Sequence, residues 1–503
     1  MHVELILYVL ILLLLYFFDL FFFFTNDDFA LSSDLSSGFE APFVNYILVI
    51  LFRCLYHFRE MVDWYPLVLI FLQNVNLYIV YKLLISHKRG WSRLMMVPPV
   101  IILIVGISYN LLAVISVFAS YVIWEKSRWK YYKALSLLAA LTASFFRLEL
   151  AIISGVFIFV YHYAFIDRSW KWGFRLVLCF VLAITLNISL VERFGSEEFK
   201  SYSQFNSKRG ILHGFEFKVS QKLLKEIGWS DRDLFYFKKF LFYDESKFNT
   251  STLSLINLEN QSYSRRFRPV HLAEYFSTFS FLALPFWILV ASFCNAALKK
   301  KKLDTFLFAT ASFIVYALLL FFLRLPDRLV LPLFLMLVWT VMDDSNSSSS
   351  FPKLGEVLIV FLFVFMWSYS LVSLVAGIRE ASKSKSYNNF IANVVSEYRS
   401  EKPLVLFGLD RFVSNYPPAL TRNDYLKHIV PFGWQIFSPR YYSLLKAPSL
   451  SALRTRLILN EVEILFFHGK RVKAKELIEY YFRSDGICFK DMSDYSLIRS
   501  CKR

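Results

Sequence analysis

The sequence has few glycines, prolines and charged residues, and it has no cysteine motif. Gly and Pro each occur 15 times in 503 residues, and charged residues make up 19% of the chain. Apolar residues make up 56%, with a positive mean hydropathy, which exceeds the apolar fraction of an ordinary soluble domain. The five cysteines form no Cys-x-x-Cys pair and no His/Cys cluster with zinc spacing, so no metal-thiolate site is indicated. The composition predicts a polytopic membrane protein.

Two further features are missing. The first apolar run, residues 5–24, lacks a basic segment before it and a small-residue cleavage site after it, so it is interpreted as a retained anchor rather than a cleaved signal. The formal net charge of +17 would suggest nucleic acid only if it lined one soluble face, but many Lys and Arg lie in short loops between apolar runs. That distribution is typical of membrane topology, and no nucleic-acid partner is expected.

The apolar runs predict about eleven transmembrane helices of roughly 20 residues, some of them shortened or tilted. The short run 43–56 carries Arg53, His57 and Glu60 at helical spacing on one side, so we expect it to lie along the outer membrane surface. The four-lysine run 299–302 is then cytoplasmic, as the distribution of Lys and Arg in membrane proteins requires. The predicted location is the cell inner (plasma) membrane, crossed several times.

Composition also predicts two domains. Residues 1–377 are expected to form a transmembrane domain with outer loops 25–63 and 191–270, and residues 378–503 a small extracytoplasmic α/β domain. Short apolar runs at 404–407 and 464–467 are typical of its buried strands. Cys488 and Cys501 lie in this domain; they could form a disulfide in an oxidising compartment, but two unpaired thiols are the favoured interpretation.

Charged residues collect on the predicted outer face. Asp27 and Asp28 directly follow the first apolar run, and charges beside hydrocarbon cost several kcal/mol unless they are solvated, paired or used. The other outer charges are Glu40 in the same loop, Arg147 and Glu149 in a tight turn between the spans 134–146 and 151–165, and Arg324 and Arg328 in a second turn. Arginine at the lipid boundary suits a lipid-linked phosphate. The alternatives are that the acidic pair is a solvated loop and that the arginines pair with neighbouring carboxylates to close the bundle.

The order of these features resembles the polytopic GT-C glycosyltransferases, particularly bacterial members that build surface polysaccharides. The resemblance rests on Asn26-Asp27-Asp28 after the first helix, then Ser36-Ser37-Gly38, then a surface helix before Trp64-Tyr65. In the large outer loop, residues 202–209, 228–233 and 242–245 are similar to a pattern found in uncharacterised bacterial members. The sequence departs from that pattern at His213-Gly214, where an Asp is expected.

The resemblance implies transfer of a sugar from a polyprenyl-phosphate donor to a glycan, a lipid-linked glycan or a protein. Asp27 or Asp28 would take the acceptor's proton, and Arg328, with Arg324 or Arg147, would stabilise the leaving phosphate. In-line displacement would invert the anomeric centre. No cofactor is required, although Asp27 and Asp28 are compatible with a divalent cation, Mg²⁺ or Mn²⁺.

Glu149 and Glu40 are further candidates for the substrate site, and membrane lipids are expected partners. Two other functions stay open. A polysaccharide polymerase or ligase would use a lipid-linked oligosaccharide in the same membrane. A flippase or transporter of lipid-linked sugars usually shows internal repeats and broken helices near the bilayer midplane, and the sequence contains no repeat.

Overall fold

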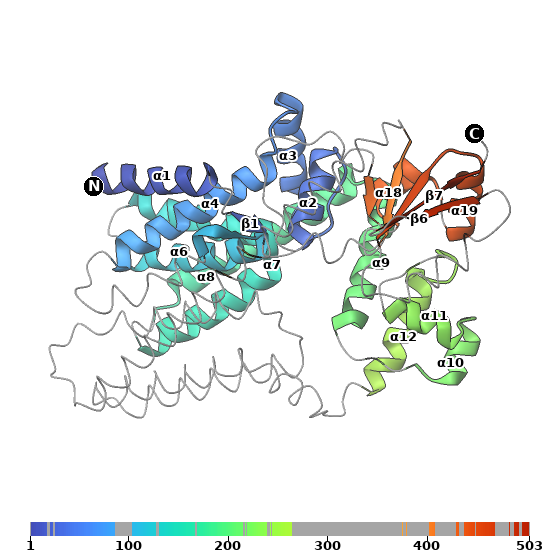
Figure 1. The fold of residues 1–503 in the computed structure, drawn as a ribbon. Coiled ribbons are helices and arrows are strands. Elements are labelled where there is room, and N and C mark those ends of the chain that lie inside the picture. Colours follow the sequence, from blue (N-terminus) through green and yellow to red (C-terminus); the bar gives the residue numbers. More distant parts are fainter. Residues whose placement is uncertain are drawn as a thin grey trace, which may run out of the picture.

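The structure is a computed structural model in which the elements form two groups (Figure 1). The described residues are 2–17, 21–23, 26–85, 103–126, 130–165, 169–214, 217, 219–238, 242, 244–263, 375, 379, 402–407, 429–431, 437–447, 449–467, 482, 487–491 and 495–501. The first group, blue to cyan in Figure 1, contains helices from the N-terminal part of the chain, and the second contains further helices and a C-terminal sheet. Each group has its own cluster of buried hydrophobic side chains.

Apolar helices make up most of the first group. A helix satisfies its backbone hydrogen bonds internally, which is what a chain needs in hydrocarbon. By length and composition, three described stretches are apolar enough to cross a membrane: Trp64–Leu83, Tyr131–Phe159 and Lys171–Phe194. They lie in α4 (Trp64–Val80) with η1 (Tyr81–Ile85), in α7 (Lys130–Phe165), which is divided by a turn at Arg147, and in α8 (Lys171–Phe194). The group also contains α1 (His2–Phe17) and α6 (Tyr109–Lys126). The spans predicted after residue 263 lie outside the described residues.

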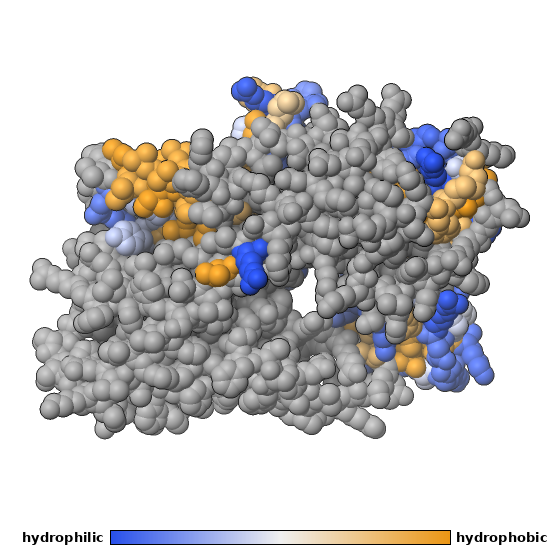
Figure 2. All heavy atoms as spheres, viewed as in Figure 1, coloured by the Kyte–Doolittle hydropathy of each residue, from blue (hydrophilic) through white to orange (hydrophobic). Residues whose placement is uncertain are grey.

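Helix α1 has an apolar surface. Its exposed side chains include Leu5, Ile6, Leu7, Leu10 and Leu13. Figure 2 shows the resulting apolar surface at the upper left, where Figure 1 places α1. A continuous apolar patch is rare on soluble monomers, and this one fits contact with lipid.

Basic residues meet at one end of the helical group. Lys133 of α7 and Arg175 of α8 both lie over the ring of Trp124, near the end of α6, at 4.8 and 4.3 Å from its centroid. Lys82 pairs with Glu4 at the start of α1, so α1 and the α4–η1 helix are antiparallel. The distribution of Lys and Arg in the sequence predicts that the basic residues Lys82, Lys133 and Arg175 lie at the cytoplasmic ends of the helices.

Helix α7 reverses direction at Arg147. Ser136, near its start, donates to the Ser120 carbonyl of α6 at 2.7 Å, and His162, near its end, lies 3.7 Å from Glu125 of α6. Arg147, in its middle, lies over the ring of Tyr109, which begins α6, at 5.7 Å. Arg147 has extended backbone angles (φ −157°, ψ 93°). The tight turn predicted between residues 145 and 149 is therefore present.

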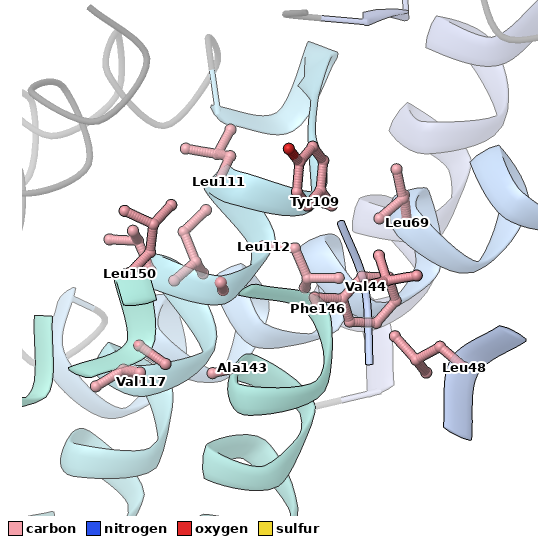
Figure 3. Close-up of a cluster of buried hydrophobic side chains, with 14 of the residues drawn as sticks. Val44, Leu48, Leu69, Tyr109, Leu111, Leu112, Val117, Ala143, Phe146 and Leu150 are labelled. Atoms are coloured by element: carbon pink, nitrogen blue, oxygen red, sulfur yellow. The ribbon is translucent and has the colours of Figure 1, made fainter. Parts of the chain in front are cut away.

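Buried apolar side chains hold this turn against its neighbours. Figure 3 shows Leu112 of α6, Phe146 of α7 and Val44 in one cluster, and all three are buried. The backbone N–H of Asn45 donates to the Phe145 carbonyl at 2.8 Å. This bond ties the turn at Arg147 to the residue that directly precedes the helix beginning at Tyr46.

The prediction of a continuous span over residues 5–24 is wrong. Helix α1 ends at Phe17, and β1 (Phe22–Phe23) is extended and pairs in parallel with β2 (Gly106–Ile107). Aromatic residues favour extended backbone, and two buried carbonyls beside this pair have a side-chain donor. The Gln73 side chain of α4 donates to the carbonyls of Leu103 and Gly106 at 2.5 and 2.8 Å.

The first part of the outer loop expected over residues 25–63 contains a helix, α2 (Asn26–Ser36). Two carboxylates in its first turn complement the positive end of the helix dipole. Gly38 follows its last turn with φ +80°, a conformation that glycine adopts without steric cost. Most side chains of α2 are buried, so this segment is a packed element rather than a solvated loop.

Helix α3 (Tyr46–Phe58) begins and ends at the same end of the helical group. The Tyr46 hydroxyl donates to the carbonyl of Phe194, the last residue of α8, at 2.7 Å. The Tyr56 hydroxyl donates to Asp63, which precedes α4. Both contacts lie away from the basic end, as the predicted surface helix requires.

The second group contains a five-stranded sheet with strand order β4-β3-β5-β7-β6. Strand β3 is parallel to β4 and β5, whereas β7 is antiparallel to β5 and β6. The strands are β3 (Leu404–Phe407), β4 (Ile429–Pro431), β5 (Glu463–Phe467), β6 (Ile487–Asp491) and β7 (Tyr495–Ser500). Both apolar runs predicted as strands are strands, and the short helices α18 (Pro439–Leu445) and α19 (Leu450–Ile458) make the fold of this part α/β.

Cys488 and Cys501 form a disulfide with their Cα atoms 5.1 Å apart. The favoured interpretation of two unpaired thiols is therefore wrong. Cys488 lies on β6 and Cys501 directly follows β7, and the antiparallel pairing of these two strands brings the two cysteines together. The sequence alone does not show how these two strands are aligned.

The polar region after α8 shares a core with the sheet. It folds into α9 (Glu197–Gly214), α10 (Gln221–Glu226), α11 (Asp231–Lys238) and α12 (Thr250–Tyr263). Phe205 of α9 packs against Phe437, which precedes α18, with ring centroids 5.6 Å apart. One cluster of buried side chains includes Phe205, Phe242, Val405 and Ile464. The outer loop and the C-terminal segment, which the sequence assigns to different domains, thus pack as one unit.

Candidate active site

Asp28 is fully buried and joins three helices. Its Oδ1 accepts hydrogen bonds from the Tyr65 hydroxyl of α4 at 3.0 Å and from the backbone N–H of Tyr109 at 2.9 Å. Tyr109 is the first residue of α6, and the first N–H groups of a helix have no partner within it. The negative carboxylate therefore caps α6 and is stabilised by the helix dipole. Asp28 fixes the relative positions of α2, α4 and α6.

Asp27 has different surroundings. Its side chain is partly exposed, and successive residues of a helix point about 100° apart, at 3.6 residues per turn. Two arginines from distant parts of the chain, Arg147 and Arg209, interact electrostatically with Asp27. One carboxylate of the pair is thus a packed structural group, and the other is partly exposed and lies within electrostatic range of two cations.

Arg147 lies at the turn of α7. Its guanidinium lies over the rings of Phe43 and Tyr109, at 5.8 and 5.7 Å from the centroids, and its Nε is 3.2 Å from Glu149 Oε2. The Glu149 side chain is 69% exposed, so this ion pair is solvated on one side. The structure thus brings together Asp27, Arg147 and Glu149, three of the site residues named from the sequence.

Arg209 of α9 completes the charged cluster and was not among the predicted site residues. It is 4% exposed, donates to the Asn206 side chain, and lies over the rings of Phe205 and Phe242 at 5.8 and 5.3 Å. Burial lowers the pKa of its guanidinium, whereas Tyr202 and Asp27 act in the opposite direction. An arginine keeps its charge despite such a shift, so a buried cation lies within electrostatic range of Asp27.

A sequence signal for Arg209 exists. Tyr202, Asn206 and Arg209 follow each other at spacings of four and three residues, which places them on one face of a helix. A buried polar face on an outer-loop helix is unusual, because Arg is almost never fully buried without partners. This spacing does not show which part of the chain the face interacts with.

Glu40 has partners that join structural elements. Its carboxylate accepts hydrogen bonds from the Tyr46 hydroxyl at 2.5 Å, from the Ser196 backbone N–H at 3.1 Å and from the Ser196 hydroxyl. Arg53 lies 3.8 Å away. Since Tyr46 begins α3 and Ser196 precedes α9, Glu40 ties the start of α9 to the helical group.

Other predicted features lie beyond the charged cluster. Arg324 and Arg328 lie outside the described residues. Among the residues that the structure describes, no group of three or more His, Cys, Asp or Glu side chains could hold a metal ion. In chemical terms, the cluster offers the Asp27 carboxylate to accept a proton and two guanidiniums to bind an anion, while the second carboxylate, Glu149, is paired with Arg147.

No known protein family matches this chain, and no curated protein matches it in sequence. A solved structure that resembles it is the crystal structure of ArnT from Cupriavidus metallidurans in the apo state, with 12% sequence identity and a TM-score of 0.43 over 98% of this chain and 97% of that chain. A likeness at this identity and TM-score carries no argument about activity. The proposal below rests on the residues of this chain.

Proposed function

We propose that this protein is an integral membrane glycosyltransferase that moves a sugar from a polyprenyl-phosphate donor to an acceptor on the extracytoplasmic face. The observation that carries the proposal is the contrast within the acidic pair. Asp28 is buried and bonded to Tyr65 and Tyr109, whereas Asp27 is partly exposed and interacts electrostatically with Arg147 and Arg209. A reacting base must be reachable by substrate, and the charge of a leaving phosphate needs cations nearby.

The roles follow from this arrangement. An acceptor hydroxyl attacks the anomeric carbon of the donor sugar, its proton passes to the Asp27 carboxylate, and the bond between the anomeric carbon and the phosphate oxygen breaks. The polyprenyl phosphate leaves with the electron pair, and the configuration at the anomeric carbon inverts. Arg147 and Arg209 stabilise the charge on the phosphate. Arg328 and Arg324 remain proposed phosphate ligands from the sequence.

The surroundings support a donor that is anchored in lipid. The first group of elements carries the apolar surface of α1 and the helices long enough to cross a membrane. Arg147 lies at a turn between two arms of α7, so its charge is at one end of the helices rather than along their sides. A phosphate at the lipid boundary would reach this position while its polyprenyl tail stays in hydrocarbon.

The first prediction tests Asp27 directly. Purified protein is incubated with a set of polyprenyl-phosphate monosaccharides, and sugar transfer or release is measured for the parent and for Asp27→Asn. Loss of a positioned base typically lowers the rate about 10²- to 10⁴-fold, and asparagine keeps the size of the side chain. We expect a loss of that order with normal yield of folded protein.

The matched control is Glu198→Gln, which neutralises an exposed carboxylate on α9 and should transfer sugar at the parent rate. If Asp27→Asn also works at the parent rate, Asp27 is not the base. If the parent protein releases and transfers no sugar from any donor in the set, the glycosyltransferase proposal itself is wrong.

A further inference from the structure

A buried arginine of the C-terminal part of the chain contacts α2. Arg440, the second residue of α18, is 1% exposed. Its Nη1 donates to the Ser33 hydroxyl and lies 3.6 Å from Asp34 Oδ1. The Asp34 side chain is 4% exposed, so this is a buried ion pair between the two groups of elements.

At its position in the first turn, Arg440 does not stabilise its own helix, α18. Cations stabilise the C-terminal end of a helix and are unfavourable in the first turn, yet Arg440 follows directly on Pro439 at the start of α18. Ser438 already caps this helix, because its hydroxyl accepts a hydrogen bond from the Tyr441 N–H at 3.2 Å. The Arg440 guanidinium therefore stabilises α2 rather than its own helix.

Asp34 and Asp27 share one face of α2. They are seven residues apart, or about two turns and 10 Å along the axis. Both interact electrostatically with Tyr202 of α9, and Asp34 pairs with Arg440 of α18, so this face carries charges that act on the second group of elements. On another side of α2, the Ser32 hydroxyl contacts the Asp63 carboxylate at 2.8 Å, and Asp28 fixes the first turn.

We propose that Arg440 is a positioning residue through which the C-terminal part of the chain fixes α2 and thereby the Asp27 carboxylate. Asp28 and Ser32 anchor α2 to the helical group, and Arg440 anchors its Asp27 face from the opposite group. The coupling between Arg440 and α2 is independent of the reaction. Its effect on catalysis rests on the proposed function.

The first experiment measures the coupling without activity. Hydrogen exchange of the α2 amides, residues 26–36, is followed in the purified full chain for the parent, Arg440→Gln and Arg456→Gln. Arg456 belongs to the same C-terminal part but bonds within it, to Glu461 and to the Leu445 carbonyl. We expect exchange in α2 to rise about tenfold or more in Arg440→Gln and to stay at the parent level in Arg456→Gln.

Two further variants keep the test decisive if Arg440→Gln folds poorly. Ser33→Ala removes one acceptor and keeps the ion pair, so it should raise α2 exchange to a smaller extent. The double variant Asp34→Asn with Arg440→Gln removes both buried charges, which proteins tolerate better than the loss of one partner. If α2 exchanges at the parent rate in Ser33→Ala and in the double variant, the coupling is absent.

The second experiment measures the consequence for catalysis. We expect Arg440→Gln to lower kcat about 10- to 100-fold in the folded fraction, because a small displacement of a reacting group is costly, while KM for the donor changes little. In an Asp27→Asn background the same substitution should have no further effect, since it acts through Asp27. Equal effects in both backgrounds would overturn the positioning role. A parent protein without transfer activity would contradict the proposed function and leave the exchange experiment to decide the coupling.

Discussion

Asp27 and Asp28 are adjacent, yet each is held by a different environment. A buried carboxylate is tolerated when it accepts hydrogen bonds and lies at a helix N-terminus, and Asp28 meets both conditions through Tyr65 and Tyr109. Asp27 keeps contact with solvent and interacts electrostatically with two guanidiniums, from α7 and α9. A difference of one residue on the same helical turn separates a buried scaffold group from the carboxylate that we propose as the base.

The second prediction concerns the scaffold group. Tyr65→Phe removes the hydroxyl that donates to Asp28, and a hydrogen bond to a buried charge contributes about 1.5–3 kcal/mol. We expect the free energy of unfolding in detergent to fall by about that amount. Tyr131→Phe, which removes a hydroxyl at a site that is 84% exposed, should unfold like the parent. Equal stability of Tyr65→Phe and the parent would show that Asp28 does not depend on this bond.

The third prediction concerns the need for a metal ion. Arg147 and Arg209 interact electrostatically with Asp27, and in the proposed mechanism their charges stabilise the leaving phosphate without a divalent ion. We expect sugar transfer to persist after treatment with EDTA. Loss of transfer in EDTA, restored by Mg²⁺ or Mn²⁺ but not by Ca²⁺, would instead assign Asp27 a metal-binding role. The control is the same treatment followed by added NaCl.

At the scale of elements, the short β1–β2 pair explains how non-helical backbone is accommodated among apolar helices. Unsatisfied backbone groups in an apolar environment cost several kcal/mol each. The strands bond each other, and the Gln73 amide donates to the carbonyls of Leu103 and Gly106. This places Tyr109, two residues after β2, where its N–H reaches Asp28. The acidic pair thus depends on an element far from α2 in the sequence.

The fourth prediction tests this support. Gln73→Leu keeps a similar volume but leaves two buried carbonyls without their side-chain donor. Since an unsatisfied buried group costs about 1–3 kcal/mol, we expect a marked fall in the thermal unfolding temperature in detergent. Phe71→Leu, on the same helix at a position 63% exposed, should have little effect. A Gln73→Leu protein as stable as the parent would mean that the two carbonyls find other partners.

At the scale of the whole molecule, the two ends of the helical group have different chemistry. Lys133 and Arg175 surround Trp124 at one end, whereas Asp28 and Arg147 lie at the other, beside the start of α6. Helix α9, which leads into the second group, follows α8 at this acidic end, where Glu40 holds Ser196. The candidate site and the C-terminal α/β part therefore lie on the same side, which we propose to be extracytoplasmic.

The fifth prediction tests that side. In a background where Cys54, Cys179 and Cys294 are replaced by alanine, single cysteines are introduced at Ser451 of α19 and at Lys126 of α6, both exposed. A membrane-impermeant maleimide applied to intact cells should label Ser451→Cys and leave Lys126→Cys unlabelled until the cells are lysed. The reverse labelling pattern would place the C-terminal part in the cytoplasm. The Cys488–Cys501 disulfide is consistent with an oxidising compartment.

Local patterns in the sequence determined the helices α4, α6 and α8, the turn at Arg147, and the strands β3 and β5. These elements depend on hydrophobic runs and on charges that interrupt them, and both are visible within a short window of the chain. For the same reason the Asp27–Asp28 pair could be singled out, because two carboxylates after an apolar run are conspicuous whatever the rest of the chain does.

The tertiary structure alone decided which of these residues meet. The end of α1 at Phe17, the helical form of α2, the disulfide, the electrostatic interaction of Arg209 with Asp27 and the ion pair of Arg440 with Asp34 all depend on partners that are distant in the sequence. A buried charge or an extended backbone segment is stable only where such a partner satisfies it. No local pattern specifies that partner, because the pairing is a property of the packed chain.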